Sequence, residues 1–428
     1  MRTINHTPFV FLPVPSRVAP PARSLTLIVK GTFDLKHRGV CTPATKQLPI
    51  SGDKPYLDDI GRSLAWASDL APFKPHTDFY VIGSFHQPGG KAAPEGRASF
   101  QLGPMHKELV FHGPRKAIKG PHERWSITPP EPMLTVPLRW EYSFGGLDDR
   151  RNPMGMGIDP TPEAGGTKVV FLPLIEDPLF PILTLKDRPQ PANFAPVPLS
   201  FQQRRAKLGT RDRRWATFRA PLPPSDYDPS YHNAAPQDQQ AGNYPRGDET
   251  LVLHNLHPKI AVLTTQLPGQ RLRVGVLRNT TAGVAAEAVP MHLDTVVAIP
   301  DSDRLVLVWR GVTAQQMDFL PDEMLLFECE AEPLDHPPAS PCLPERMLAA
   351  YHAEGAAEAK AQQAETDQAF AEMRTLLAKA ALPPAVMKAV ETETDPQVIF
   401  DTLDRHLTSI LDALKRDYPQ IAKKLASR

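Results

Sequence analysis

The distribution of proline constrains this chain more than any other feature. Of its 49 prolines, 44 lie before Leu343, and the last 86 residues hold only five, together with 18 Ala and a single Gly. Proline lacks a backbone donor and breaks helix interiors, so long helices are excluded from the first part of the chain. The sequence therefore predicts a body at 1–332, a proline-rich linker at 333–344 and an α-helical C-terminal region at 345–428.

Short strands dominate the predicted body. Apolar and polar residues alternate between Leu25 and Leu35, which predicts a strand with one face in a core and one in water. A similar pattern with an intervening turn predicts a hairpin with a long tip over 78–102. A second hairpin is expected from 293–299 and 304–310 around a Pro-Asp-Ser-Asp turn. The segment 145–240 has little periodicity and is expected to be ordered loop with a few short strands.

The C-terminal region has the composition of helices. Glu345–Ala381 is rich in Ala, Glu, Lys and Gln, and Pro383–Pro384 ends that pattern. A second helix is expected from Pro396, with Asp395 as its cap. Its apolar stripe is Phe400, Leu403, Leu407, Ile410, Leu411 and Leu414. The stripe could cover the chain's own β-domain or receive a partner helix or hydrophobic segment. The predicted fold class is thus mainly β, with a loop- and proline-rich body and a C-terminal α-helical hairpin or arm.

Charge and cysteine content exclude several classes of function. Lys plus Arg number 48 and Asp plus Glu number 48, so the net charge is zero, which argues against a general nucleic-acid or membrane-surface binder. Cys41, Cys329 and Cys342 show neither a disulfide framework nor a zinc knuckle. No apolar run approaches the ~18 residues of a membrane helix. A cytoplasmic location is expected. One basic cluster, Arg204–Trp215, is expected to form a solvated face or to pair with acidic loops.

The most enzyme-like group of residues is His232, Asp248, His254 and His257. Imidazole and carboxylate groups together are what a zinc or iron site requires. However, residues 251–253 predict a strand running into a loop, where the spacing of His254 and His257 does not converge, so hydrogen-bonded loop residues are favoured. Phosphate-loop, dinucleotide and nucleophile-elbow motifs are absent or incomplete, and no cofactor is expected.

Several loop phrases, in order, resemble a bacterial family defined by a domain of unknown function and found with type VI secretion effectors. They are Pro88–Lys91, Phe144–Gly146, Arg151–Gly157, Asn233–Gln240, Gly247–Glu249, Asn255–Pro258, Leu293–Thr295 and Leu307–Gly311. The resemblance covers about 9–311. It implies an adaptor or chaperone that binds a secreted effector, often one linked to a PAAR-repeat tip protein, and helps load it onto the trimeric secretion spike. It implies no nucleic-acid or membrane partner.

The family supplies no catalytic residues to transfer to this chain. We expect the matched polar, glycine and proline positions to build the fold. They include Asn152, Pro153, Gly155, Gly157, Asn233, Asp238, Gln239, Gln240, Asp248, Asn255, His257, Trp309 and Arg310. Two alternatives stay open: a metal-dependent hydrolase built on the 232–257 cluster, and a structural subunit of an assembly. The stripe at 403–414 is the predicted partner-binding candidate in the tail.

Overall fold

The computed structural model describes residues 2–16, 23–120, 124–162, 168–280, 283–315, 326–337, 339–378, 384–392, 396–417 and 419. The chain divides into two compact units, Met1–Met347 and Leu348–Arg428. The first is β-rich and the second helical, so the mainly β fold class with a C-terminal helical segment is confirmed.

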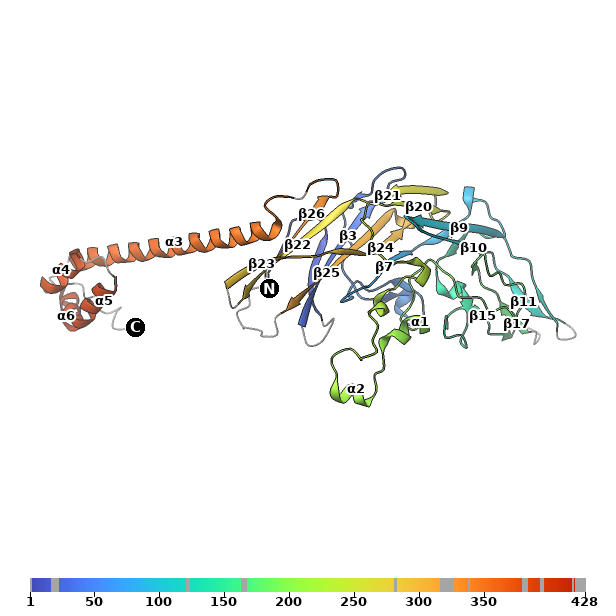
Figure 1. The fold of residues 1–428 in the computed structure, drawn as a ribbon, viewed down its shortest axis with the longest axis horizontal. Coiled ribbons are helices and arrows are strands. Elements are labelled where there is room, and N and C mark those ends of the chain that lie inside the picture. Colours follow the sequence, from blue (N-terminus) through green and yellow to red (C-terminus); the bar gives the residue numbers. More distant parts are fainter. Residues whose placement is uncertain are drawn as a thin grey trace. The chain divides into compact units, whose positions relative to one another are not determined.

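A seven-stranded sheet forms the centre of the first unit (Figure 1). Its order is β19 (Gln240–Ala241), β7 (Thr77–Val81), β24 (His292–Ile299), β25 (Arg304–Gln315), β3 (Arg23–Asp34) and β2 (Val10–Ser16), with β4 (Thr42–Pro43) also paired to β3. Strands β24 and β7 run parallel, whereas the other pairs are antiparallel. The central sheet therefore joins segments that are up to 292 residues apart in sequence, as in the pairing of Gln315 with Arg23.

Two further sheets share the main core with one face of the central sheet. One has the order β1 (Arg2–Asn5), β26 (Leu326–Pro333), β22 (Gln270–Thr280), β23 (Gly283–Val289). The other has the order β18 (Ile175–Glu176), β10 (Met105–His112), β9 (Glu95–Leu102), β20 (Thr250–His254), β21 (Val262–Gln266). Val29, Leu307, Val276, Phe327 and Phe100 belong to one buried cluster that spans all three sheets.

The opposite face of the central sheet is also buried. Val306 and Val308 pack there in a second cluster with Trp66, which ends a short strand, and Ala234, which comes from a long loop. The prediction that one face of the 25–35 strand lies in water is therefore wrong. Lys30, on that face, is only 1% exposed, and its Nζ lies 2.7 Å from Asp69 Oδ2. Period-two alternation shows that the two faces of a strand differ in polarity. A polar face can still be buried when distant residues supply hydrogen-bond or ion-pair partners for its side chains.

One predicted hairpin is confirmed and the other is wrong. Strands β24 and β25 pair in antiparallel fashion around a 3₁₀ turn at Pro300–Ser302. In contrast, β7 pairs with β24 and β19, while β8 (Ser84–His86) pairs with β13 (Thr135–Pro137) and β9 pairs with β10 and β20. The 78–102 segment thus supplies strands to three sheets, because each strand has a partner distant in sequence.

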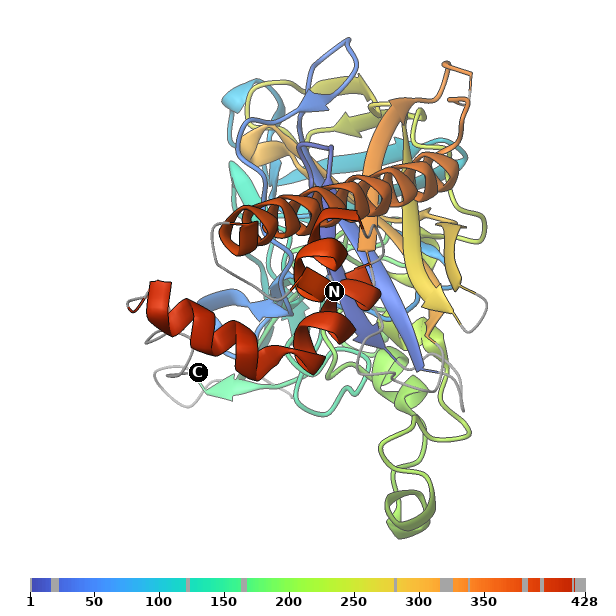
Figure 2. The same cartoon turned by 90° about the vertical axis from the view of Figure 1, so that its left-hand side faces the viewer.

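The remaining strands of the first unit are short. They are β11 (Lys116–Lys119), β12 (Trp125–Ile127), β16 (Thr161–Pro162) and β17 (Lys168–Phe171) in one sheet, β14 (Phe144–Gly145) with β15 (Met156–Gly157), and β5 (Lys54–Pro55) with β6 (Leu64–Trp66). The prediction of loop with short strands over 145–240 is confirmed. Two short helices are added to it, α1 (Gln202–Arg205) and α2 (Arg213–Phe218). Helix α2 stands away from the sheets (Figures 1 and 2).

The helical segment contains α3 (Leu343–Ala378), α4 (Pro384–Thr392), α5 (Pro396–Arg405) and α6 (Leu407–Asp417). The predicted single helix from Pro396 is wrong, because it is interrupted at His406, and α4 was not predicted. Helix α4 contacts α5, α5 contacts α6, and each contributes one buried apolar residue: Val386, Ile399 and Ile410. Among the helices in the described part, none combines the length and apolar character needed to cross a bilayer.

The predicted tail stripe is only partly buried. Ile410 is 5% exposed, Leu403 and Leu411 are half-buried, and Leu407 is 49% exposed. Leu414 lies in α6, but its side chain and that of Phe400, together with the proposed cap Asp395, are outside what the structure describes.

Candidate functional site

An apolar pocket of about 430 Å³ lies beside α2, in the first unit. Two segments line it: the loop before β7 and the loop-rich segment that contains α2. The lining residues are Pro72, Phe73, Leu208, Arg211, Trp215, Ala220, Pro221, Leu222, Pro223, Tyr227, Pro229, Tyr231 and His232. A volume of this size falls within the range of about 300 to 1,000 Å³ that is usual for ligand sites.

Three aspartates fix the backbone around the pocket. Asp212 caps α2 by accepting a 2.8 Å hydrogen bond from the Trp215 backbone N–H. Asp226 accepts hydrogen bonds from the backbone N–H and hydroxyl of Thr210, and Asp228 accepts one of 2.8 Å from the Ser230 N–H. Short aspartate side chains compete well for local backbone donors, which explains why a segment with little regular structure is ordered.

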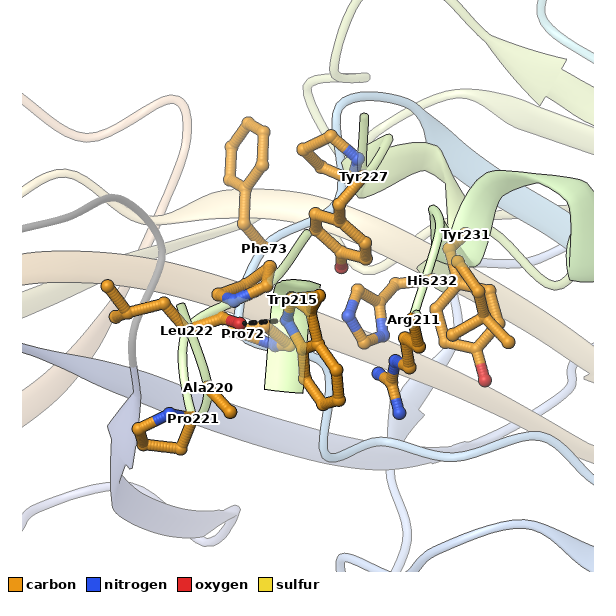
Figure 3. Close-up of a pocket in the computed structure, with 13 residues that line it drawn as sticks. Pro72, Phe73, Arg211, Trp215, Ala220, Pro221, Leu222, Tyr227, Tyr231 and His232 are labelled. Atoms are coloured by element: carbon orange, nitrogen blue, oxygen red, sulfur yellow. Dashed lines mark hydrogen bonds between the residues drawn. The ribbon is translucent and has the colours of Figure 1, made fainter. Parts of the chain in front are cut away.

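Aromatic rings form one wall of the pocket (Figure 3). The indole Nε1 of Trp215 donates a 2.9 Å hydrogen bond to the Leu222 carbonyl, which ties α2 to the proline-rich turn. The rings of Tyr227 and Tyr231 pack edge to face with His232, with centroids 6.2 and 5.1 Å apart, and the two tyrosine rings are tilted to each other at 6.5 Å. Such pairs hold large side chains in fixed positions. The walls of the pocket are thus held in place by hydrogen bonds and ring contacts of the protein itself.

His232 is a neutral imidazole within this wall. Burial, together with the nearby cations Lys74, Arg204 and Arg310, lowers its pKa to about 3. Neither ring nitrogen has a hydrogen-bond partner among the described residues. Because a neutral imidazole has one donor and one acceptor, His232 offers both to a group that enters the pocket.

Two arginines stack on aromatic rings at the site. Buried Arg204 donates to the carbonyls of Val197 and Tyr231 and lies over the Tyr231 ring; burial lowers its pKa. Exposed Arg211 lies 5.4 Å from the ring centroid of Trp215. One of the two expectations for the 204–215 cluster is that its arginines pair with acidic loops. Within the described residues they do not, because the nearby aspartates bind backbone N–H groups instead. Its exposed members form a solvated face.

A buried network of charges lies next to the pocket. It contains three cations and three carboxylates, each no more than 3% exposed: Lys30 with Asp69, Lys74 with Asp78, and Arg310 with Asp294. Arg310 also donates to the Asp69 carbonyl, and Lys74 donates to Thr295, whose hydroxyl donates to Asp294. The charges balance, so each ion has an opposite neighbour in the low-dielectric interior.

This network holds the chain immediately after His232. Asp78 accepts hydrogen bonds from Asn233 Nδ2, at 2.9 Å, and from the N–H groups of Ala234 and Ala235, at 2.8 and 3.2 Å. Asn233 Nδ2 also donates to the His76 carbonyl. Central-sheet strand β7 therefore positions one end of the pocket wall.

The structure does not bring the four candidate metal ligands together. His232 lies in the pocket wall, and Asp248 pairs with Arg246. His254 is exposed at the end of β20, whereas His257 is buried and contacts Asp303, with its Nδ1 accepting from the N–H groups of Lys259 and Ile260. Within the described ranges, no three His, Cys, Asp or Glu side chains form a group that could hold a metal ion.

Many of the motif residues donate hydrogen bonds to backbone carbonyls. Asn152 donates to the carbonyls of Trp140 and Phe144, Gln239 to those of Phe79 and Phe194, Gln240 to that of Ala235, and Asn255 to that of Arg97. Asp238 pairs with Lys107, and Trp309 stacks on Phe9. Pro153 lines a separate pocket of about 590 Å³. A Cβ on Gly155 would lie 2.7 Å from the Ser143 carbonyl oxygen, and one on Gly157 would lie 3.1 Å from the Phe144 ring.

Sequence reasoning missed most of the pocket. Only Arg211 and Trp215, in the basic cluster, and His232, as a metal ligand, were singled out. The available signal was composition: four aromatic or imidazole side chains and four prolines lie from Trp215 to His232, not counting Phe218. The contribution of Pro72 and Phe73 depends on a contact across more than 130 residues and left no local signal.

The fold and this site define a class: a β-rich protein of several sheets that carries an aromatic, proline-walled surface pocket. The chain belongs to a bacterial family whose model matches residues 21–310 and whose description is "Uncharacterized protein conserved in bacteria (DUF2169)". No curated protein and no solved structure matches the chain significantly.

Proposed function

We propose that this protein is a non-enzymatic, cytoplasmic adaptor or chaperone that binds a type VI secretion effector in the producing cell. It would hold the effector, often one linked to a PAAR-repeat tip protein, and help to load it onto the trimeric spike. The proposal rests on the resemblance between the loop motifs of this chain and those of a family found with such effectors. Membership of a bacterial family over 21–310 is compatible with it.

One structural observation supports a role in binding a polypeptide. The pocket presents fixed aromatic rings, prolines and an unpaired imidazole at the base of a segment that stands away from the sheets (Figures 1 and 3). Aromatic and arginine side chains in concave, partly desolvated positions are typical of the residues that dominate protein–protein binding energy.

Affinity purification from the native bacterium tests the proposal. A tagged copy of the chain should recover an effector or tip protein, and the two purified partners should co-elute from a size-exclusion column in a fixed ratio. Loss of the gene should lower effector stability or delivery. Normal effector stability, loading and delivery in its absence would refute the proposal, and a stable homo-oligomer without effector would favour a structural subunit.

A further inference from the structure

The segment that builds the pocket carries an uncompensated positive charge. Residues 202–232 contain seven Arg or Lys and three Asp, a formal charge of 7 − 3 = +4 in a chain whose net charge is zero. The imbalance is concentrated in α1, α2 and the turn between them.

The three aspartates of this segment do not neutralise its arginines. Asp212, Asp226 and Asp228 bind backbone N–H groups of Trp215, Thr210 and Ser230. Five cations are left with no ion pair or side-chain hydrogen bond to any residue that the structure describes: Arg205, Lys207, Arg211, Arg213 and Arg214. Arg211 lies over the ring of Trp215. These charges are therefore available to an external anion.

The apolar pocket lies directly beside these charges. Arg211 and Trp215 line it, and Trp215 lies one residue after Arg214. Neutral His232 adds no charge to the cavity, so the cavity accepts an apolar group while its rim attracts anions. Cations at a rim next to an apolar cavity complement carboxylates that flank an apolar side chain.

We propose that this pocket docks an acidic polypeptide segment that inserts one aromatic or aliphatic side chain among Phe73, Trp215 and Tyr227, while its carboxylates pair with Arg211, Arg213 and Arg214. The occupant is part of the partner protein, so the inference deepens and rests on the proposed function. Guanidinium groups suit this role because they bind carboxylates through two parallel hydrogen bonds.

The ring geometry favours a polypeptide over a single-stranded nucleic acid. Nucleic-acid grooves of that kind present ring faces on which successive bases stack. Here Tyr227 and Tyr231 meet His232 edge to face, at interplanar angles of 69° and 73°, and Arg211 lies over the ring of Trp215. These rings pack against their neighbours and do not form a row of open faces.

Fluorescence anisotropy with synthetic peptides tests the inference on the full-length protein. The probe is a fluorescein-labelled peptide of alternating Asp and Glu around one central Phe. A peptide with Gly in place of Phe, a peptide with Lys in place of the acids, and an oligodeoxythymidylate serve as comparisons. The acidic Phe peptide should bind at least about tenfold more tightly than either peptide comparison, and its affinity should fall with salt. Equal binding of the three peptides would overturn the inference, and tighter binding of the oligonucleotide would assign the site to nucleic acid.

Charge reversal at the rim identifies the binding residues. Arg211→Glu with Arg214→Glu should weaken the acidic Phe peptide by at least about tenfold, and both side chains are exposed, so folding should be retained. Lys46→Glu with Arg124→Glu changes the net charge equally at exposed sites outside the pocket and should have no comparable effect. Equal effects of the two double variants would attribute binding to net charge and contradict a specific site.

The peptide and effector experiments fail in distinguishable ways. If the acidic peptide binds but no effector or tip protein co-purifies, the docking site stands and the proposed function fails. If the effector co-purifies equally well with the Arg211→Glu, Arg214→Glu variant, the adaptor function stands and the docking site is refuted.

Discussion

Replacing Asp78 with Asn tests the buried charge network that supports the pocket. Asp78 is fully buried, and its Oδ2 accepts from Lys74 Nζ and from the Ala234 N–H, both at 2.8 Å. Asn keeps the shape, but its NH₂ group would face donors in either orientation, Lys74 and Ala234 on one side or Asn233 and Ala235 on the other. Breaking one partner of a buried ion pair typically costs about 3–5 kcal/mol. That is a large part of the ~5–15 kcal/mol that stabilises most domains.

Urea unfolding followed by circular dichroism measures this cost. Asp78→Asn should lower the free energy of unfolding by about 3–5 kcal/mol with little change in the denaturant slope. Adding Lys74→Met removes the stranded ammonium, so the double variant should lose less than the sum of the two single variants, with a coupling of about 1–3 kcal/mol. Glu108→Gln, which breaks the exposed pair with Arg97, is the control and should cost under about 1 kcal/mol. A cost for Asp78→Asn as small as that of the control, or strictly additive effects, would refute the reasoning.

Three further predictions address the pocket wall, the tail and a motif glycine. An unfolded imidazole takes up a proton near pH 6.5, whereas His232 in the folded chain takes one up only near pH 3, so acid favours the unfolded state. Between pH 7 and pH 5 the free energy of unfolding of the wild type should therefore fall by about 2 kcal/mol more than that of His232→Gln. Parallel pH profiles of the two proteins would show that His232 is not the cause. Ile410→Asp buries a charge and should melt the helical segment by circular dichroism, whereas Leu407→Asp, at a half-exposed site, should change stability by under about 1 kcal/mol; equal effects would contradict the burial pattern. Gly155→Ala should cost about 1–3 kcal/mol because its Cβ meets backbone, while Gly242→Ala, with open space around it, should be nearly neutral in the same thermal-melt comparison.

Local signals in the sequence predicted elements well and partners poorly. The β24–β25 hairpin was predictable because both strands and their turn are contiguous. The hairpin predicted over 78–102 is wrong, although this segment does contain strands. Its first strand, β7, pairs in parallel with β24, which is more than 200 residues away in sequence. Strand periodicity carries no information on which distant strand completes a sheet.

The same limit explains the errors about burial and the site. Alternation places the polar face that carries Lys30 in water, yet Lys30 is buried, and Asp69, 39 residues later in the sequence, neutralises it. The spacing of His254 and His257 was correctly read as strand running into loop, and their side chains have different surroundings. The pocket depends on Phe73 meeting the 208–232 segment, which only the three-dimensional fold reveals.

Effector secretion in a strain that lacks the gene, complemented with defined variants, tests the central claim most directly. Wild-type protein should restore delivery of the effector, and Arg211→Glu with Arg214→Glu should not, although both proteins accumulate to the same level. The Lys46→Glu, Arg124→Glu variant should restore delivery fully. Undiminished secretion without any copy of the gene would contradict the account.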